Sequence, residues 1–360
     1  MNDEKNINID EANTEIEEYS CPNCDGALEF IPDKQQLCCK YCGFEMPIDG
    51  KVGEEEYDFL NNNEEENTWN LESKVIHCDN CGANTVIDNN EISFSCPFCG
   101  SNSVAETNEL SGIKPHRVVP FKMSNEFSKE NYSKWLKKKF FVPKKVKKDI
   151  PSLKLRGVYL PVWTFDTNTI SLYKGRLGKH YTTTVGSGKN KRTVTKTRYF
   201  YISGNQKVIF DDLIINAGSK ISQSELNQIA PFNTNDSYLY EKGYLVGFSA
   251  EHYTVKLNTG WENSKLIMKK QIENRILSRY SYDVVSYLNV NTTYNDIKYK
   301  YVLIPIWIGT YGYNNKTYRF ISNGETGKSS GKYPISALRV TFVVLIFSIL
   351  VILLICLFNS

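Results

Sequence analysis

Two segments of this chain carry the same cysteine pattern: residues 21–43 read CPNCDGALEFIPDKQQLCCKYCG, and residues 78–100 read CDNCGANTVIDNNEISFSCPFCG. Both follow the spacing C-x2-C-x14-C-x2-C. Two thiols on one tight turn supply half of a tetrahedral metal shell, and a second turn brought back by a hairpin completes it. The pattern therefore predicts two tandem zinc ribbons. The predicted ligands are Cys21, Cys24, Cys39, Cys42, Cys78, Cys81, Cys96 and Cys99.

The residues around these cysteines also favour metal. Glycine follows Cys42, Cys81 and Cys99, at a place where a knuckle turn needs a positive φ. We therefore expect two structural zinc ions, each held by four cysteines. A disulfide framework and a redox pair are the alternatives. Cys38 is left over, and Ser95 takes its place in the second copy, so we interpret Cys38 as a strand residue beside a ligand.

The C-terminal stretch predicts a transmembrane helix. From Val340 to Phe358 the chain has 19 residues without charge. Such a helix would be about 28 Å long, close to the thickness of the bilayer's hydrocarbon core. Lys328, Lys332 and Arg339 precede it, so the positive-inside rule predicts a single-pass cell-membrane protein with its folded domains in the cytoplasm and its C-terminus outside. A reducing cytoplasm also favours thiolate ligands over disulfides.

Charge is distributed unevenly along the chain. Residues 1–109 hold 25 acidic and 5 basic side chains, whereas residues 110–360 hold 15 acidic and 38 basic ones. Binding to phosphate groups needs lysine and arginine. Nucleic acid is therefore not expected to bind through the ribbons, although it could bind through the basic body.

The fold class that follows is multidomain α+β. We expect a disordered acidic tail at 1–19, zinc ribbons at 20–48 and 75–105, an acidic linker at 49–74, a β-rich α+β body at 113–335 and a transmembrane helix at 340–358. In the body we expect helices at 124–141, 222–229 and 258–280. The expected strands are 157–166, 181–185, 193–201, 208–215, 244–255, 283–293, 299–312 and 316–322.

A short pattern recurs within the body. Residues 159–163 read YLPVW, and residues 303–307 read LIPIW. The body could consist of two related β-rich halves, or the repeat could be chance. Because proline cannot donate a backbone hydrogen bond, Pro161 and Pro305 predict edge positions or strand starts.

A group of lysines follows the first expected helix and could contact an anionic surface. It has three interpretations: a solvated face, a contact with anionic lipid, which a membrane tether would favour, or a nucleic-acid contact. Its members are Lys134, Lys137, Lys138, Lys139, Lys144, Lys145, Lys147 and Lys148.

No motif in the chain indicates catalysis. Residues 324–329 read GETGKS, but Ser322 stands where a phosphate-binding loop needs glycine, so Asn323-Gly324 is interpreted as a hairpin turn. A zinc site closed by four thiolates has no open position for water. We therefore expect a protein that is not an enzyme.

Several segments together resemble a bacterial family of TFIIB-type zinc-ribbon membrane proteins, the YdjG-like proteins. The resemblance lies in the CPNC and CPFCG knuckles, in FFVP at 140–143, in YLPVW at 159–163 and in ISNGETG at 321–327. Members often carry a replication or primosomal-helicase-like label, but this chain has no helicase motor motif. The resemblance implies a membrane-stress setting, with SPFH-domain or phage-shock-type proteins as partners.

These observations lead to two hypotheses of function. The first is a non-enzymatic, tail-anchored adaptor that recruits protein partners at the cytoplasmic membrane, in the envelope stress response. The alternative is a membrane-tethered, replication-associated factor that binds nucleic acid through its basic body.

Overall fold

The computed structural model describes residues 19–48, 50–53, 55–61, 73–88, 96–99, 104–107, 113–149, 153, 155–314 and 316–359. Within these residues the chain is a strand-rich α+β protein with five helices, the last of which is the apolar helix α5 (Ala337–Asn359). The expected α+β class and the apolar C-terminal helix are confirmed. The acidic tail predicted at 1–19 lies, except for Tyr19, outside the described residues.

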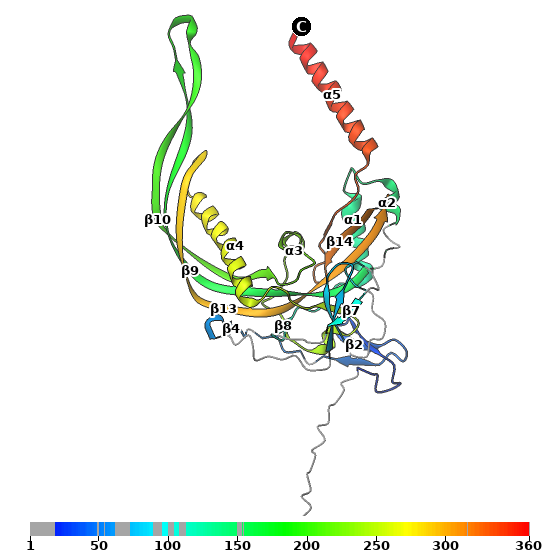
Figure 1. Ribbon diagram of the computed structural model, residues 1–360. Coiled ribbons are helices and arrows are strands. Elements are labelled where there is room, and N and C mark those ends of the chain that lie inside the picture. Colours follow the sequence, from blue (N-terminus) through cyan, green and yellow to red (C-terminus); the bar gives the residue numbers. More distant parts are fainter. Residues whose placement is uncertain are drawn as a thin grey trace, which may run out of the picture.

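Three long strands form the main part of the sheet. The strand β9 (Leu155–Val185) pairs antiparallel with β10 (Arg192–Asn216) on one side and with β13 (Val284–Tyr313) on the other. Figure 1 shows them rising as a curved arm on one side of the molecule, with α4 (Leu257–Leu277) on the concave side. Bulges near Asp212 and Asp296, both with positive φ, let the strands bend without ending.

The sequence predicted shorter strands over the same segments, so the strand type is confirmed and the continuity was missed. The missed part of β9 has an inverted pattern, because Thr169 and Ser171 are buried while Ile170 and Leu172 are exposed. The buried hydroxyl of Thr169 donates to the carbonyl of Val208 at 2.7 Å. A search for strands by hydropathy assumes that the buried side chains are apolar. It therefore missed the part of β9 between residues 166 and 181.

A short strand, a helix and a long strand follow one another twice in the body, and within the described residues only the first set has a second helix, α2 (Lys144–Asp149), before its long strand. The first half has β8 (Arg117–Val118), α1 (Asn125–Lys137) and β9, and the second has β12 (Ser249–Glu251), α4 and β13. In each half the short strand pairs in parallel with the long strand of the other half. The helix of each half also packs on strands of both halves: α1 contacts β9 and β15 (Ser329–Gly331), and α4 contacts β9 and β13.

The two repeated tryptophans occupy matching places. The indole of Trp163 donates to the carbonyl of Val255 at 2.8 Å, and the indole of Trp307 donates to the carbonyl of Met123 at 2.9 Å. Each acceptor lies between the short strand and the helix of the other half. The YLPVW and LIPIW segments also pair directly, with Pro161 opposite Leu303 and Pro305 opposite Tyr159.

The prediction that both prolines sit at edges or strand starts is wrong. Both lie inside long strands with neighbours on either side, at places where one neighbouring strand gives way to another. Beside Pro161, β10 ends and β12 begins, and beside Pro305, β8 ends and β14 (Lys316–Asn323) begins. The carbonyl of each proline still accepts a bond, from the backbone N–H of Ala217 or Gly324. Because the change of neighbour leaves no regular ladder bond at that point, the missing N–H is tolerated.

The cysteine-containing segments join the body closely. The first forms an antiparallel sheet of β1 (Leu28–Ile31), β2 (Gln36–Cys39) and β3 (Glu45–Pro47). The second contributes β5 (Ser73–Cys78), β6 (Asn84–Asp88) and β7 (Val104–Thr107), and β6 pairs with β12 of the body. The second segment is thus continuous with the large sheet. Between them, β4 (Tyr57–Asp58) pairs with β13.

Two short strands complete the edges of the sheet: β11 (Tyr238–Leu239) pairs with β8, and β15 (Ser329–Gly331) pairs with β14. The other helices are α2 (Lys144–Asp149) and α3 (Gln223–Ile229). The hairpin expected at Asn323-Gly324 is confirmed, because β14 and β15 pair antiparallel, but Asn323 ends β14 and the connection is the longer segment 324–328. The strand expected at 244–255 is mostly wrong, since that segment holds the end of a 3₁₀ turn (Lys242–Leu245), a loop and the short β12.

Candidate metal centres

Four cysteine sulfurs converge at the end of the first small sheet. The Sγ atoms of Cys21 and Cys42 lie 3.3 Å apart, those of Cys24 and Cys39 lie 3.5 Å apart, and all four fall within 4.8 Å of one another. Cys21 and Cys39 are buried, while Cys24 and Cys42 are exposed. The knuckles face each other because β1 and β2 form the hairpin expected between the two cysteine pairs.

The second group has the same arrangement. The Sγ atoms of Cys78 and Cys99 and those of Cys81 and Cys96 are each separated by 3.6 Å. Cys78 and Cys96 are buried, as are their counterparts in the first group. The spacing of the cysteines thus correctly predicted which eight thiols come together.

The backbone turns around three of the cysteines are alike. In each turn the cysteine N–H donates to the carbonyl five residues later, as from Cys21 to Gly26 at 2.8 Å. The cysteine carbonyl accepts from the N–H four residues later, and that residue has a positive φ: Asp25, Gly43 or Gly82. The expected positive φ is confirmed at both of the described glycines, whereas Gly100 lies outside the described residues.

These groups have the chemistry of a four-thiolate metal site. A tetrahedral zinc with Zn–S bonds of about 2.3 Å holds its sulfurs roughly 3.8 Å apart, close to the distances seen here. The backbone N–H of Cys42 lowers the pKa of the Cys39 thiol to about 7, which favours its thiolate. Burial and bonds among the thiols raise the pKa of Cys24, Cys42, Cys81 and Cys96, so a bound cation would have to displace their protons. Both groups could therefore hold a metal ion, and all ten cysteines are outside disulfides.

The leftover Cys38 is a strand residue of β2 and is not part of either group. It lies between Glu29 and Glu45 on the neighbouring strands, and burial raises the pKa of its thiol. A substitution of Cys38 can therefore serve as the control for a substitution of its neighbour Cys39 when metal binding is measured.

The backbone of the second metal group is held by basic residues of the body. The ammonium of Lys220 donates to the carbonyl of Cys81, and the guanidinium of Arg156 donates to the carbonyl of Cys96. In the first group, Phe30 packs against Tyr244 with ring centroids 5.6 Å apart. Both metal groups therefore dock on the body instead of extending from it.

A third cluster was not predicted from the sequence. Carboxylates of Glu56, Asp166 and Asp211 come within 4.8 Å of one another. Burial, and then the hydrogen bond with Glu56, raise the pKa of Asp166 to about 8. The ammonium of Lys300 lies 3.6 Å from Glu56 and balances part of this charge. The cluster fastens the segment before β4 to the long strands.

The eight predicted lysines lie on α1, on α2 and in the turn between them. Most are exposed, and the ammonium of Lys147 donates to the carbonyl of Lys137 at 2.9 Å, which ties the two helices together. The turn also contacts the start of α5, because the N–H of Ser336 donates to the carbonyl of Phe141 at 2.8 Å. The guanidinium of Arg339 donates to the carbonyl of Phe140. The lysine cluster therefore lies beside the first turn of α5.

The helix α5 has the length and composition of a membrane span. Its apolar stretch covers Ala337–Leu357 with a mean hydropathy of 3.4, and none of it is buried against the rest of the chain. The predicted span at 340–358 lies almost entirely inside this stretch. Figure 1 shows α5 leaving the body on the side opposite to β2 of the first cysteine group.

Comparison with known proteins gives one informative similarity. The chain is 25% identical over 323 residues to the uncharacterized protein YdjG of Bacillus subtilis (strain 168), which covers 88% of this chain and 90% of that protein. No protein-family model matches the chain, and no solved structure matches it. The similarity therefore spans most of the length of both chains.

Proposed function

We propose that this protein is a non-enzymatic membrane adaptor, anchored by α5, that presents two zinc-stabilised ribbons to protein partners in the cytoplasm. The observation that carries the proposal is that the membrane helix and the first cysteine group lie on opposite sides of the body. The apolar helix leaves one side of the body, and the first cysteine group lies on the other (Figure 1). A partner bound to that group would be held at a distance from the bilayer.

Zinc is the metal that this donor set favours. Thiolates select zinc over magnesium and calcium, and four of them close the coordination shell. The sites would then stabilise the fold and leave no position for substrate. The TFIIB-type ribbon assignment rests on the cysteine spacing and on the three matching knuckle turns.

The cytoplasmic orientation is supported by the basic residues beside α5. Lys328, Lys332 and Arg339 precede the span, and α1 and α2 bring further lysines to the same place through the contacts of Phe140 and Phe141. Positive charge at one end of a span favours the cytoplasmic side. The same location counts against nucleic acid, because the bilayer would cover part of this surface.

We further propose that the body arose from two related halves. The matching strand–helix–strand orders, the reciprocal parallel pairings and the two indole hydrogen bonds support it. For partners we propose SPFH-domain or phage-shock-type proteins of the envelope stress response, as the resemblance to YdjG-like proteins implies.

A photo-cross-linking experiment tests the adaptor role. Tyr41 lies between two predicted ligands, and its side chain is 81% exposed, so it is available to a partner. A photoreactive amino acid in its place should cross-link a discrete protein in native membranes. The matched control is Leu266 on α4, which is also exposed (68%) but lies on the arm. Equal labelling at both positions, or none at Tyr41, would count against the proposal.

A further inference from the structure

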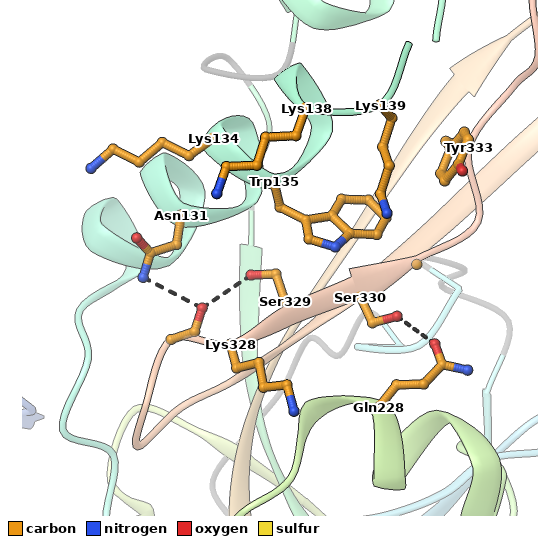
Figure 2. Close-up of a pocket in the computed structure, with 12 residues that line it drawn as sticks. Asn131, Lys134, Trp135, Lys138, Lys139, Gln228, Lys328, Ser329, Ser330 and Tyr333 are labelled. Atoms are coloured by element: carbon orange, nitrogen blue, oxygen red, sulfur yellow. Dashed lines mark hydrogen bonds between the residues drawn. The ribbon is translucent and has the colours of Figure 1, made fainter. Parts of the chain in front are cut away.

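A basic pocket lies where α1, β15 and α3 meet, shortly before α5 begins. Figure 2 shows side chains from all three elements around it, together with Tyr333 of the connector to α5. Its volume is about 690 Å³, within the range of small-molecule sites. The sequence did not predict it, because Lys328 and Tyr333 come nearly two hundred residues after α1.

The charge around this pocket has one sign. The charged side chains that line it, within the described part of the chain, are Lys134, Lys138, Lys139 and Lys328. Lys134 pairs with Glu130 at 2.9 Å, and Lys328 donates to the carbonyl of Ala230 at 2.6 Å. Among the described residues, Lys138 and Lys139 have no carboxylate partner. The pocket therefore holds uncompensated positive charge.

Aromatic and polar groups complete its walls. The Trp135 and Tyr333 rings meet edge to face at 5.7 Å, and the ammonium of Lys139 lies 4.8 Å from the centre of the Trp135 ring. Asn131 and Ser330 reach the pocket from opposite sides and fix its walls through bonds to Gly327 and Gln228. A ligand could thus meet ammonium, hydroxyl and aromatic groups together.

The position of the pocket indicates where its ligand comes from. The connector after Tyr333 is tied to the turn between α1 and α2, because the N–H of Ser336 donates to the carbonyl of Phe141. Next to it, the apolar side chains of Phe140, Ile335 and Leu338 are each more than half exposed. Tryptophan, tyrosine and lysine at the end of a span are typical of the level of lipid headgroups.

We propose that this pocket binds the phosphorylated glycerol headgroup of an anionic phospholipid. A phosphate offers oxygen acceptors in several directions, so lysines from α1 and from the β14–β15 turn can approach it at once. Polar side chains would meet the glycerol hydroxyls, while the acyl chains would leave over the exposed apolar residues. Nucleic acid fits less well, because it needs an extended basic track. The inference rests on the membrane attachment proposed above for the source of its ligand.

The test counts lipids retained by the full chain in detergent, where no bilayer surface adds a general attraction. Native mass spectrometry should detect one bound phosphatidylglycerol and no bound phosphatidylcholine. Each lysine near an anionic lipid is worth about fivefold in affinity, so Lys138→Gln with Lys139→Gln should weaken retention on the order of 30-fold. A second variant, Ser330→Trp, fills the pocket without changing its charge and should weaken retention at least as much.

The matched control is Lys144→Gln with Lys145→Gln, which removes the same charge from exposed positions on α2 outside the pocket. It should retain the lipid. If both double variants lose the lipid equally, or if Ser330→Trp retains it, the lipid does not bind in this pocket. Binding of free glycerol phosphate as strong as that of the lipid would overturn the lipid as its source. Carbonate extraction of the same variants tests membrane attachment separately, and photo-cross-linking at Tyr41 tests the adaptor role.

Discussion

At the scale of the residue, the two neighbours Cys38 and Cys39 have different surroundings. Cys39 is buried and directs its sulfur to three other thiols, whereas Cys38 lies between two carboxylates on the same strand. We expect the purified full chain to contain about two zinc ions, because both groups have a complete set of thiolates.

Substitution of these two cysteines distinguishes a metal site from a general effect on the strand. Cys39→Ala should lower the zinc content to about one ion per chain, since three thiolates hold zinc less tightly than four. Cys38→Ala should leave about two. Metal analysis of the purified variants measures both. A wild-type protein with one zinc ion or none, or an equal loss in both variants, contradicts two four-cysteine sites.

Residue patterns predicted the metal groups well because their chemistry is local. A ligand pair, its glycine and the hairpin between two pairs all lie within about twenty residues, so spacing alone defines them. Lys328 and Tyr333, by contrast, reach Trp135 through the hairpin of β14 and β15. Lysine counts could identify a basic helix but not the second wall of a pocket.

At the scale of the element, sequence reasoning identified strands and helices but not their extent or pairing. Ser124 and Ser222 were correctly expected to begin helices, and both accept a capping bond from the first turn. The sequence predicts several short strands in place of the three long strands of the arm, because the buried side of the arm is rich in hydroxyl groups. The parallel pairing of each short strand with the other half was hidden because it joins residues far apart in the sequence.

The two indole bonds give a test at this scale. Trp163→Phe and Trp307→Phe should each lower the free energy of unfolding by about 1–3 kcal/mol, because each leaves a loop carbonyl without its donor. Urea titration of the full chain in detergent measures the change. Trp135→Phe is the control, since that partly exposed indole donates no bond to the described residues, and it should change stability by about 0.5 kcal/mol or less. A loss confined to one of the two buried tryptophans would argue against equivalent halves.

At the scale of the whole molecule, the two cysteine groups and the body form one structure. The described part of the N-terminal third contacts the basic body: Lys220 and Arg156 donate to backbone carbonyls of the second cysteine group, and Lys298 forms an ion pair with Glu56 at 3.1 Å. The buried cysteines of both groups share hydrophobic core clusters with the body, so we expect that removal of a bound metal would disturb more than two small modules. Exposed basic side chains lie beside α5 and also along the arm and on α4, as Lys196, Arg198 and Lys269 do.

This distribution predicts how the molecule sits in a membrane. Because the lysines of α1 and α2 are tied to the first turn of α5, the body should lie on the cytoplasmic side with its basic surface against anionic headgroups. In cells, removal of α5 should release the protein from the membrane fraction. Protease added to inverted membrane vesicles should digest the body, whereas protease added to intact spheroplasts should leave it whole. Digestion from the outer face would reverse the orientation and would separate the metal groups from cytoplasmic partners.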